Sequence, residues 1–286
     1  MKSTSICLVK SFILNFILSL VKIIFGFIGK SSALIADGIH SFSDLATDLV
    51  AILGNIFALK PADKEHPYGH GRLEYLTSVM ISFVILFLGF MIIYKSSYVD
   101  NSIPSKIVIV VSLFTIISKF LLARYLIKKG KQYNNTILIS SGKESSMDVI
   151  SSIFVLISSN LMQFSSKYII FKYSNFIVTI MIGIFIINTG FSILKNNISS
   201  ILGEQEDTKK EEFAELINSF EKIVRIDDLS VIKNGPYYQV IGEVSMDDNL
   251  TLKEAHDVVN AIEKSIKEKD ERAQYINIHV NPVRDK

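Results

Sequence analysis

The chain has 286 residues, of which 49% are hydrophobic, and its mean hydropathy is +0.37. A soluble domain of this length could reach such values only with a very large core, so the composition indicates membrane-spanning helices. The formal net charge of +2, without a basic and aromatic pattern, argues against nucleic-acid binding, and the single cysteine, Cys7, excludes an internal disulfide bond and a thiolate metal cluster.

Six apolar stretches predict six transmembrane helices. Residues 75–94 and 173–194 contain no charged residue, and each is close to the length of about 20 residues that crosses the hydrocarbon core. The first apolar run lacks a small-residue cleavage site and is followed by further spans, so we interpret it as a span rather than a signal peptide. We expect residues 1–202 to form a transmembrane domain with helices over about 8–29, 32–59, 73–96, 105–128, 134–163 and 170–195.

The basic residues predict the orientation of these helices. Lysine and arginine are more frequent in the loops after the second, fourth and sixth spans than in the alternate loops. Because basic loops stay in the cytoplasm, we expect both termini to be cytoplasmic. The frequent isoleucine, lysine and asparagine are typical of AT-rich coding sequences, so we expect a bacterial plasma membrane.

The second span carries a polar stripe. Its members Asp37, His40, Asp44 and Asp48 fall within an arc of roughly 80° on a helix that advances about 100° per residue. Ionisable groups are costly inside a bilayer, so a shared polar face suggests a function. Two readings are open for Asp37 and Asp48: they are the entry and exit of a hydrated ion path, or both simply lie near the membrane interface.

The fifth span repeats the spacing of the central pair. Glu144 and Asp148 are four residues apart, as His40 and Asp44 are, and each pair lies on one helical face. If the two spans pack at similar depth, one imidazole and three carboxylates would surround a divalent cation and compensate its charge. The alternative is that these groups bond across helices or line a water-filled vestibule.

The loop after the second span holds another group of metal-binding side chains. Asp63, His66 and His70 lie in a stretch that Pro61 and Pro67 stiffen. Carboxylate and imidazole are ligands for divalent transition metals. These residues can form a metal site in this loop, although two histidines in a cytoplasmic loop, taken alone, are usually just solvated.

Residues 203–286 form a separate acidic domain with 19 acidic and 12 basic residues. Thr208 and Thr251, each followed three residues later by glutamate, predict two helix starts with capping boxes. Alternating residues predict three strands, over 229–233, 237–246 and 275–280. The predicted fold class is a polytopic α-helical membrane protein with six transmembrane helices, followed by a cytoplasmic α+β domain of order α-β-β-α-β.

Three patches together resemble the cation diffusion facilitator family, whose members are proton-coupled exporters of divalent metals. They are residues 36–44 in the second span, 66–74 in the following loop and 148–152 in the fifth span. Their order, spacing and topology agree with the family, and the likeness runs from the first span through the tail. The resemblance implies a homodimer held through a metallochaperone-like cytoplasmic domain.

The resemblance also implies three groups of metal ligands. The transport-site ligands would be His40, Asp44, Glu144 and Asp148. Glu144 stands where the family usually has histidine or aspartate, a change that favours manganese or ferrous iron over zinc. The loop ligands would be Asp63, His66 and His70. The ligands of a regulatory metal in the cytoplasmic domain would be Asp227, Glu243, His256 and His279, and Asn281 stands where an aspartate ligand can occur.

We therefore expect a secondary transporter, not an enzyme, that exports zinc, manganese or ferrous iron from the cytoplasm in exchange for protons. Imidazole and carboxylate bind metal only when deprotonated, which would couple the two fluxes during alternating access. No prosthetic group is expected. Divalent cations are the expected substrate and a candidate regulator, and the other expected partners are protons, membrane lipid and a second copy of the chain.

Two other functions stay open at this point. One is a membrane-anchored metal sensor whose tail signals metal status. The other is a membrane metalloenzyme that uses His66, His70 and a carboxylate to activate water, although the sequence shows no oriented base or substrate group for it.

Overall fold

The computed structural model describes the backbone of residues 2–58, 60–96, 103–133 and 136–283, and the side chains of these ranges apart from 2–5, 47, 48, 50–57, 136 and 137. The chain divides into two compact units. One comprises Met1–Leu49 and Ile81–Ser192, and the other comprises Val50–Met80 and Ile193–Lys286.

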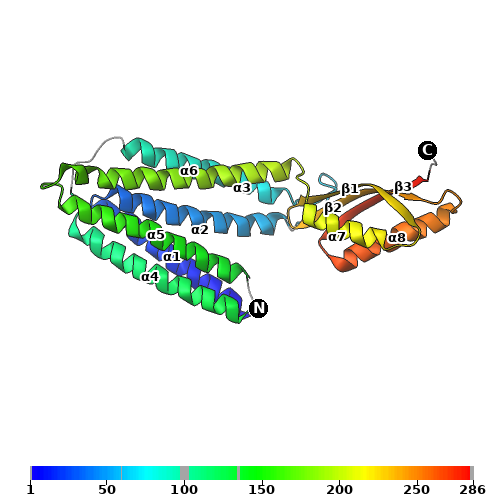
Figure 1. Ribbon diagram of the computed structural model, residues 1–286, viewed down its shortest axis with the longest axis horizontal. Coiled ribbons are helices and arrows are strands. Elements are labelled where there is room, and N and C mark those ends of the chain that lie inside the picture. Colours follow the sequence, from blue (N-terminus) through cyan, green and yellow to red (C-terminus); the bar gives the residue numbers. More distant parts are fainter. Residues whose placement is uncertain (1, 59, 97–102, 134–135, 284–286) are drawn as a thin grey trace. The chain divides into compact units, whose positions relative to one another are not determined.

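The first unit is built from long helices, three of which also contribute residues to the second unit (Figure 1). They are α1 (Lys2–Ile28), α2 (Ser32–Ala58), α3 (Leu73–Ser96), α4 (Lys106–Gln132), α5 (Thr136–Gln163) and α6 (Ser174–Ile201), with the short 3-10 helix η1 (Ile169–Tyr173) before α6. Among the described residues, five helical segments are long and apolar enough to cross a membrane, and they comprise parts of every long helix except α2. α2 has 27 residues, the length of a span, and it carries the polar stripe.

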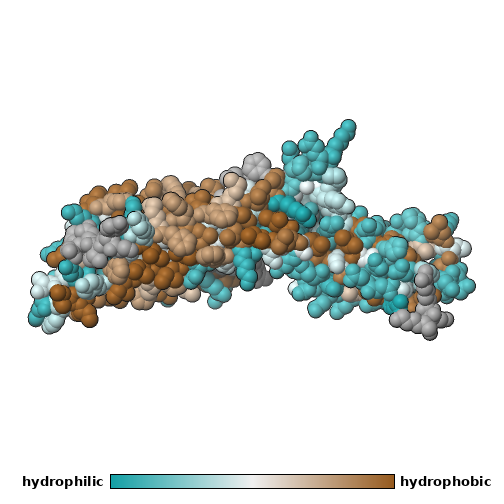
Figure 2. Space-filling model, turned by 90° about the horizontal axis from the view of Figure 1, so that it is seen from above, coloured by the Kyte–Doolittle hydropathy of each residue, from teal (hydrophilic) through white to brown (hydrophobic). Residues whose placement is uncertain are grey.

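Large apolar side chains cover the outside of these helices. Phe87, Val110 and Ile177 are each more than half exposed, and Figure 2 shows hydrophobic side chains over much of the helices and mostly hydrophilic ones over the C-terminal domain. In water such a surface would be a strong aggregation hazard, whereas lipid tails solvate it. The chain is therefore an integral, polytopic helical membrane protein.

Glycines bring three pairs of helices close together: α1 with α2, α3 with α6, and α4 with α5. A Cβ atom would lie 2.7 Å from an isoleucine Cγ1 at each of Gly38, Gly142 and Gly183. Small residues let helix backbones approach in a membrane, where close packing replaces the hydrophobic effect as the driving force. The contact between α4 and α5 matters for the site because each of these helices contributes a buried charged side chain to it.

Several helix ends differ from the sequence-based ranges. α4 and α6 run on past the expected ends at 128 and 195, because the polar residues that follow are compatible with a helix outside the membrane. The sixth span was expected from 170, but residues 169–173 form the separate turn η1. The expected start of the fifth helix, 134–135, lies outside the described residues.

The C-terminal domain belongs to the second unit and has the predicted α-β-β-α-β order. Its elements are α7 (Asp207–Asn218), β1 (Ile223–Asn234), β2 (Tyr237–Met246), α8 (Leu252–Lys269) and β3 (Ala273–Pro282). The sheet has the order β1-β2-β3, with β1 and β2 antiparallel and β2 and β3 parallel. Phe213 and Ile217 of α7 and Ile262 and Ile266 of α8 are fully buried in one core with side chains of the sheet such as Val240.

Local structure in this domain was predicted in part. The capping box at Thr251 is present, since its hydroxyl accepts from the Glu254 amide and the Glu254 carboxylate accepts from the Thr251 amide. The box at Thr208 is wrong, because α7 already begins at Asp207. Just before α7, the amide of Glu206 donates to the Val231 carbonyl of β1, which ties the chain to the sheet edge.

The first strand begins earlier than its alternating pattern suggested. β1 starts at Ile223 rather than near 229, and its pairing with β2 has irregularities between Ile223 and Arg225 and between Ile226 and Asp228. Each β-bulge shifts the inward and outward alternation by one residue, which hides the strand from a period-two search. The hairpin turn lies at the predicted place, with Gly235 at φ 61°, a conformation that glycine adopts without strain.

Candidate functional site

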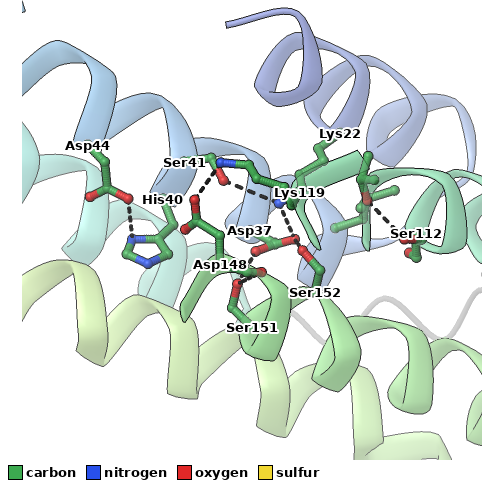
Figure 3. A network of polar contacts seen from close by, with 12 residues as sticks. Lys22, Asp37, His40, Ser41, Asp44, Ser112, Lys119, Asp148, Ser151 and Ser152 are labelled. Atoms are coloured by element: carbon green, nitrogen blue, oxygen red, sulfur yellow. Dashed lines mark hydrogen bonds and ion pairs between the residues drawn. The ribbon is translucent and has the colours of Figure 1, made fainter. Parts of the chain in front are cut away.

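Three of the four predicted transport ligands lie together in the first unit. One ligand atom each of His40 and Asp44 on α2 and of Asp148 on α5 lies within 4.8 Å of the other two. The side chains are 20%, 19% and 7% exposed, respectively. Figure 3 shows them projecting into one polar layer between helices. The matched i,i+4 spacing on two spans therefore does converge, as far as these three groups are concerned.

His40 presents a nitrogen that is suited to a metal. Among the described residues, its buried Nδ1 has no hydrogen-bond partner, and Asp44 Oδ2 is 3.8 Å away, which is too long for a hydrogen bond. A buried nitrogen without a partner is costly, and a metal ion would satisfy it. One imidazole and two carboxylates form a mixed nitrogen and oxygen set that accepts zinc, manganese or ferrous iron.

Glu144 is not part of this group. It lies one turn before Asp148 on α5, but its side chain is exposed. The set of ligand atoms that lie within 4.8 Å of one another comprises His40, Asp44 and Asp148 and does not include Glu144. Glutamate has one more rotatable bond than aspartate, so its carboxylate can reach a position away from the helix packing that holds Asp148. In this conformation the predicted four-residue set is a three-residue set.

Asp148 also makes an ion pair that the sequence did not reveal. Lys119 of α4, which is 1% exposed, donates through its ammonium to Asp148 Oδ2. The signal in the sequence is a lone lysine inside an apolar span, because such a charge needs a partner in the membrane interior. Which acid it would meet depends on how α4 packs against α5.

Asp37 lies in a closed polar cluster rather than an open path. It is completely buried, and its carboxylate forms a 2.8 Å ion pair with Lys22 of α1. Ser151 and Ser152 of α5 donate to its two oxygens at 2.6 and 2.8 Å. Because cation and hydroxyl donors saturate the carboxylate, this geometry favours a structural tie between α1, α2 and α5 over the predicted role in an ion path. The side chain of Asp48, the other predicted path residue, lies outside the described ones.

The loop ligands gather in the second unit. One ligand atom each of Asp63, His66 and His70 lies within 4.8 Å of the others. Asp63 Oδ1 is 3.3 Å from His66 Nδ1, and Asp63 Oδ2 is 3.4 Å from His70 Nε2. The centroids of the two imidazole rings lie 4.5 Å apart. The Asp63 carboxylate accepts from the backbone amides of His66 and Glu65, and these hydrogen bonds hold its pKa below the usual range. The carboxylate is thus kept ionised, as a metal ligand must be.

The same loop is fastened to the β1–β2 hairpin within this unit. The side-chain Nδ2 of Asn234 donates to the Tyr68 carbonyl at 3.1 Å, and the backbone amide of Gly235 donates to the Tyr75 hydroxyl at 2.9 Å. A side chain at Gly71 would collide with the backbone oxygen of Asn234. The backbone of the loop is therefore held close to the hairpin turn, and this contact fixes the position of the loop that carries Asp63, His66 and His70.

The four predicted ligands of the C-terminal domain do not meet within one chain. Glu243 and His279 are paired neighbours on β2 and β3, and both are exposed, on the face opposite the core. Asn281 donates to both Asp227 and Glu243, at 3.2 and 3.3 Å. His256 is exposed on α8, whose buried residues pack against the other face of the sheet. The sheet separates His256 from the other three positions, so the expected cluster of four is not formed by the described residues of one chain.

Asp227 is itself engaged by neighbours. Its carboxylate accepts from Ser245 and Arg225, both at 2.6 Å, and these bonds together with Asn281 hold its pKa below the usual range. An ionised carboxylate can bind metal, but here any ion would first have to displace these donors.

Comparison with known proteins connects both parts of the chain to one family. The cation efflux transmembrane domain matches residues 8–202, and the cation efflux protein cytoplasmic domain matches residues 205–283. An uncharacterized transporter of Methanocaldococcus jannaschii is 31% identical over 96% of this chain and 97% of its own.

Two further relatives carry functional names. The manganese efflux system protein MneP of Bacillus subtilis is 26% identical over 94% of this chain and 93% of its own. The magnetosome protein MamB of Magnetospira sp. is 24% identical over 96% of this chain and 94% of its own. With family models matching nearly its whole length, the chain belongs to the cation diffusion facilitator family of metal cation efflux transporters.

Proposed function

We propose that this protein exports a divalent transition-metal cation from the cytoplasm in exchange for protons, and that the cation binds His40, Asp44 and Asp148 in transit. The observation that carries the proposal is the convergence of these three groups from two helices, within 4.8 Å, inside a helical membrane domain. Metal-binding groups in an apolar environment are costly and are typical of an ion pathway.

Proton exchange follows from the chemistry of the ligands. Imidazole binds a metal only when neutral and carboxylate binds only when ionised, so metal and protons compete for the same atoms. Metal from the cytoplasm would displace protons from the group, and protons from outside would displace the metal. Alternating access of the helical domain would expose the group to one side at a time.

The metal and the full ligand set are further parts of the proposal. The name of the relative MneP supports Mn²⁺ as the first candidate, beside zinc and ferrous iron. Glu144 would complete the ligand set by a change of side-chain rotamer when the metal binds. An additional carboxylate favours a hard ion such as Mn²⁺.

The second unit supports a regulatory role. We place a second metal at Asp63, His66 and His70, and a homodimer contact in the C-terminal domain, whose family model is that of the cytoplasmic domain of cation efflux proteins. Any metal in the C-terminal domain would use Asp227, Glu243, His256 or His279 singly or across a dimer. We propose the plasma membrane as the site of action, with both termini in the cytoplasm.

The test is Mn²⁺ uptake into proteoliposomes under an imposed pH gradient. We expect Asp44→Ala and Asp148→Ala to abolish gradient-driven uptake, while Asp63→Ala, which removes only a loop ligand, leaves most of it. Size-exclusion chromatography in detergent checks that each variant is folded. Undiminished flux in both Asp44→Ala and Asp148→Ala would refute the assignment. Absence of flux in the wild type, with metal-dependent binding of a partner by the tail, would favour the sensor instead.

A further inference from the structure

We infer that Lys119 acts as an internal counter-cation that competes with the transported metal for the carboxylate of Asp148. The inference rests on the proposed transport function of the His40, Asp44 and Asp148 group. It adds a residue from a third helix, α4, whose charge sets how tightly that group holds a metal.

The contact itself is direct and buried. The Lys119 ammonium donates to Asp148 Oδ2, and the two side chains are only 2% and 7% exposed. In Figure 3 the ammonium reaches Asp148 from α4, while His40 and Asp44 project from α2. The carboxylate that completes the candidate metal group is therefore already neutralised by a cation of the protein itself.

The other buried lysine–aspartate pair, Lys22 with Asp37, has no ligand group beside it in the described part of the chain and serves for comparison. Asp37 accepts from Lys22 and from two serine hydroxyls, and it is completely buried. Asp148 accepts from Lys119 and also has a carboxylate oxygen within 4.8 Å of a ring nitrogen of His40, whose Nδ1 has no hydrogen-bond partner among the described residues. The first pair is saturated, whereas the second borders on ligand atoms that a metal ion can use.

Charge makes the ammonium and the metal competitors. A dication bound to Asp148 would lie close to the ammonium in a region that water screens weakly, and the two would repel each other. The four-carbon stem of lysine is flexible, so the ammonium can withdraw when a metal arrives and return when it leaves. Each binding event thus exchanges one cation at Asp148 for another, and the exchange lowers the affinity for the metal.

Weak binding has a use in a transporter. A site that holds its metal too tightly cannot release it, so a tethered cation that refills Asp148 favours release. The positive charge at 119 should therefore raise both the KM for the metal and the maximal rate of transport.

The experiment measures Mn²⁺ binding by calorimetry to the purified full chain in detergent. All variants carry His66→Ala and His70→Ala, which remove the loop ligands. Lys119→Met removes the charge and keeps the length of the side chain, and Lys119→Arg keeps the charge. Lys22→Met is the matched control, because it removes the same charge from the pair that does not border on the ligand group.

We expect Lys119→Met to lower the Kd for Mn²⁺ by about tenfold or more, and Lys119→Arg and Lys22→Met to leave it within about twofold of the parent. In proteoliposomes Lys119→Met should lower KM and the maximal rate together, which a merely structural lysine would not do. If Lys119→Met does not fold, Lys119→Gln replaces it, since its amide still donates to Asp148 without a charge, and the same fall in Kd is expected.

An unchanged or higher Kd in the folded, uncharged variant would overturn the inference, as would an equal gain in Lys22→Met. These outcomes leave the transport proposal intact as long as the parent binds Mn²⁺ and loses that binding in Asp44→Ala. Failure of the parent to bind Mn²⁺ at all would remove the transport proposal itself, and this inference with it.

Discussion

At the scale of single residues, the lysines inside apolar helices identify where buried polar side chains gather in this protein. Lys22 and Lys119 are almost completely buried, and each pairs with an aspartate on another helix. A buried pair contributes little net stability when it is complete, but removal of one partner is costly because the other charge stays behind. The two pairs differ in their surroundings, so their substitution should have different consequences.

Asp37→Asn should destabilise the protein without changing metal affinity. The substitution leaves the Lys22 ammonium buried without its counter-ion, and we expect a loss of about 3–5 kcal/mol in the free energy of unfolding. Thermal unfolding in detergent measures the loss, and calorimetry with Mn²⁺ measures the affinity. A variant of normal stability that has lost transport would instead restore Asp37 to the ion path predicted from the sequence.

Asp270 makes the C-terminal domain sensitive to acid. Its carboxylate accepts from Arg272 Nε and Nη2 at 2.9 and 2.8 Å and pairs with Lys209 at 2.9 Å, so Arg272 above all holds its pKa far below the usual range. A lowered pKa in the folded state means that the ionised form stabilises the fold. That contribution is complete above the ordinary aspartate pKa and is lost as the pH falls through the folded-state value.

Asp270→Asn should therefore cost about 1–3 kcal/mol at neutral pH and flatten the acid limb of the stability curve. Hydrogen exchange of α7 and β3 in the full chain, followed from neutral pH to well below the ordinary aspartate pKa, measures both effects. The control is Asp248→Asn on an exposed turn. An acid limb as steep as that of the wild type would show that other groups cause it.

At the scale of elements, the packing of α4 on α5 assembles the site. Gly142 lets the two helices approach at Ile127, and the charged residues Lys119 and Asp148 meet across the same interface. The α1–α2 pair has its own glycine contact at Gly38, close to the Lys22–Asp37 pair in sequence. Close contact and polar contact thus occur in the same helix pairs, because short interhelical distances are what allow buried polar side chains to meet.

Gly142→Val should separate α4 from α5 and reduce transport. A Cβ at this position would lie 2.7 Å from Ile127 Cγ1 and 3.0 Å from its backbone nitrogen, so the added side chain has no room. We expect lower thermal stability, by about 1–3 kcal/mol, and weaker Mn²⁺ uptake. Adding Ile127→Ala, which removes the nearest clashing atom, should restore part of both. If Gly142→Val alone behaves as the wild type, close approach at this point is not required.

At the scale of the whole molecule, orientation decides the direction of transport. The distribution of basic residues predicts that the loop around Lys64 lies in the cytoplasm and that the loop around Lys167 lies outside. Both side chains are exposed, and the only cysteine of the chain is Cys7. Single cysteines at these two positions can therefore report on the orientation.

In a Cys7→Ser background, Lys167→Cys should react with a membrane-impermeant maleimide in intact cells, and Lys64→Cys should react only after the membrane is opened. Mass-shift gels measure the labelled fraction, and a denatured sample gives full labelling of both as the control. The reverse pattern would place the termini outside and would contradict export from the cytoplasm.

Local features of this protein follow from the sequence by itself. Six apolar stretches predict the six long helices, five of which contain a described segment long and apolar enough to cross a membrane, and the α-β-β-α-β order of the tail appears in alternation and capping residues. The groupings of His40 with Asp44 and of Asp63 with His66 and His70 also follow from spacing. These features depend on neighbours in the chain, whose relation is set by the periods of helix and strand and by short loops.

The tertiary structure alone decided how distant residues pair. That Asp148 meets Lys119, that Asp37 is closed off by Lys22, and that Glu144 remains outside the group all depend on how helices rotate against each other. In the tail, the sheet faces keep His256 apart from Glu243. Helical periodicity says which residues share a face, but only packing says which face another helix presents, because many pairings satisfy the same apolar pattern.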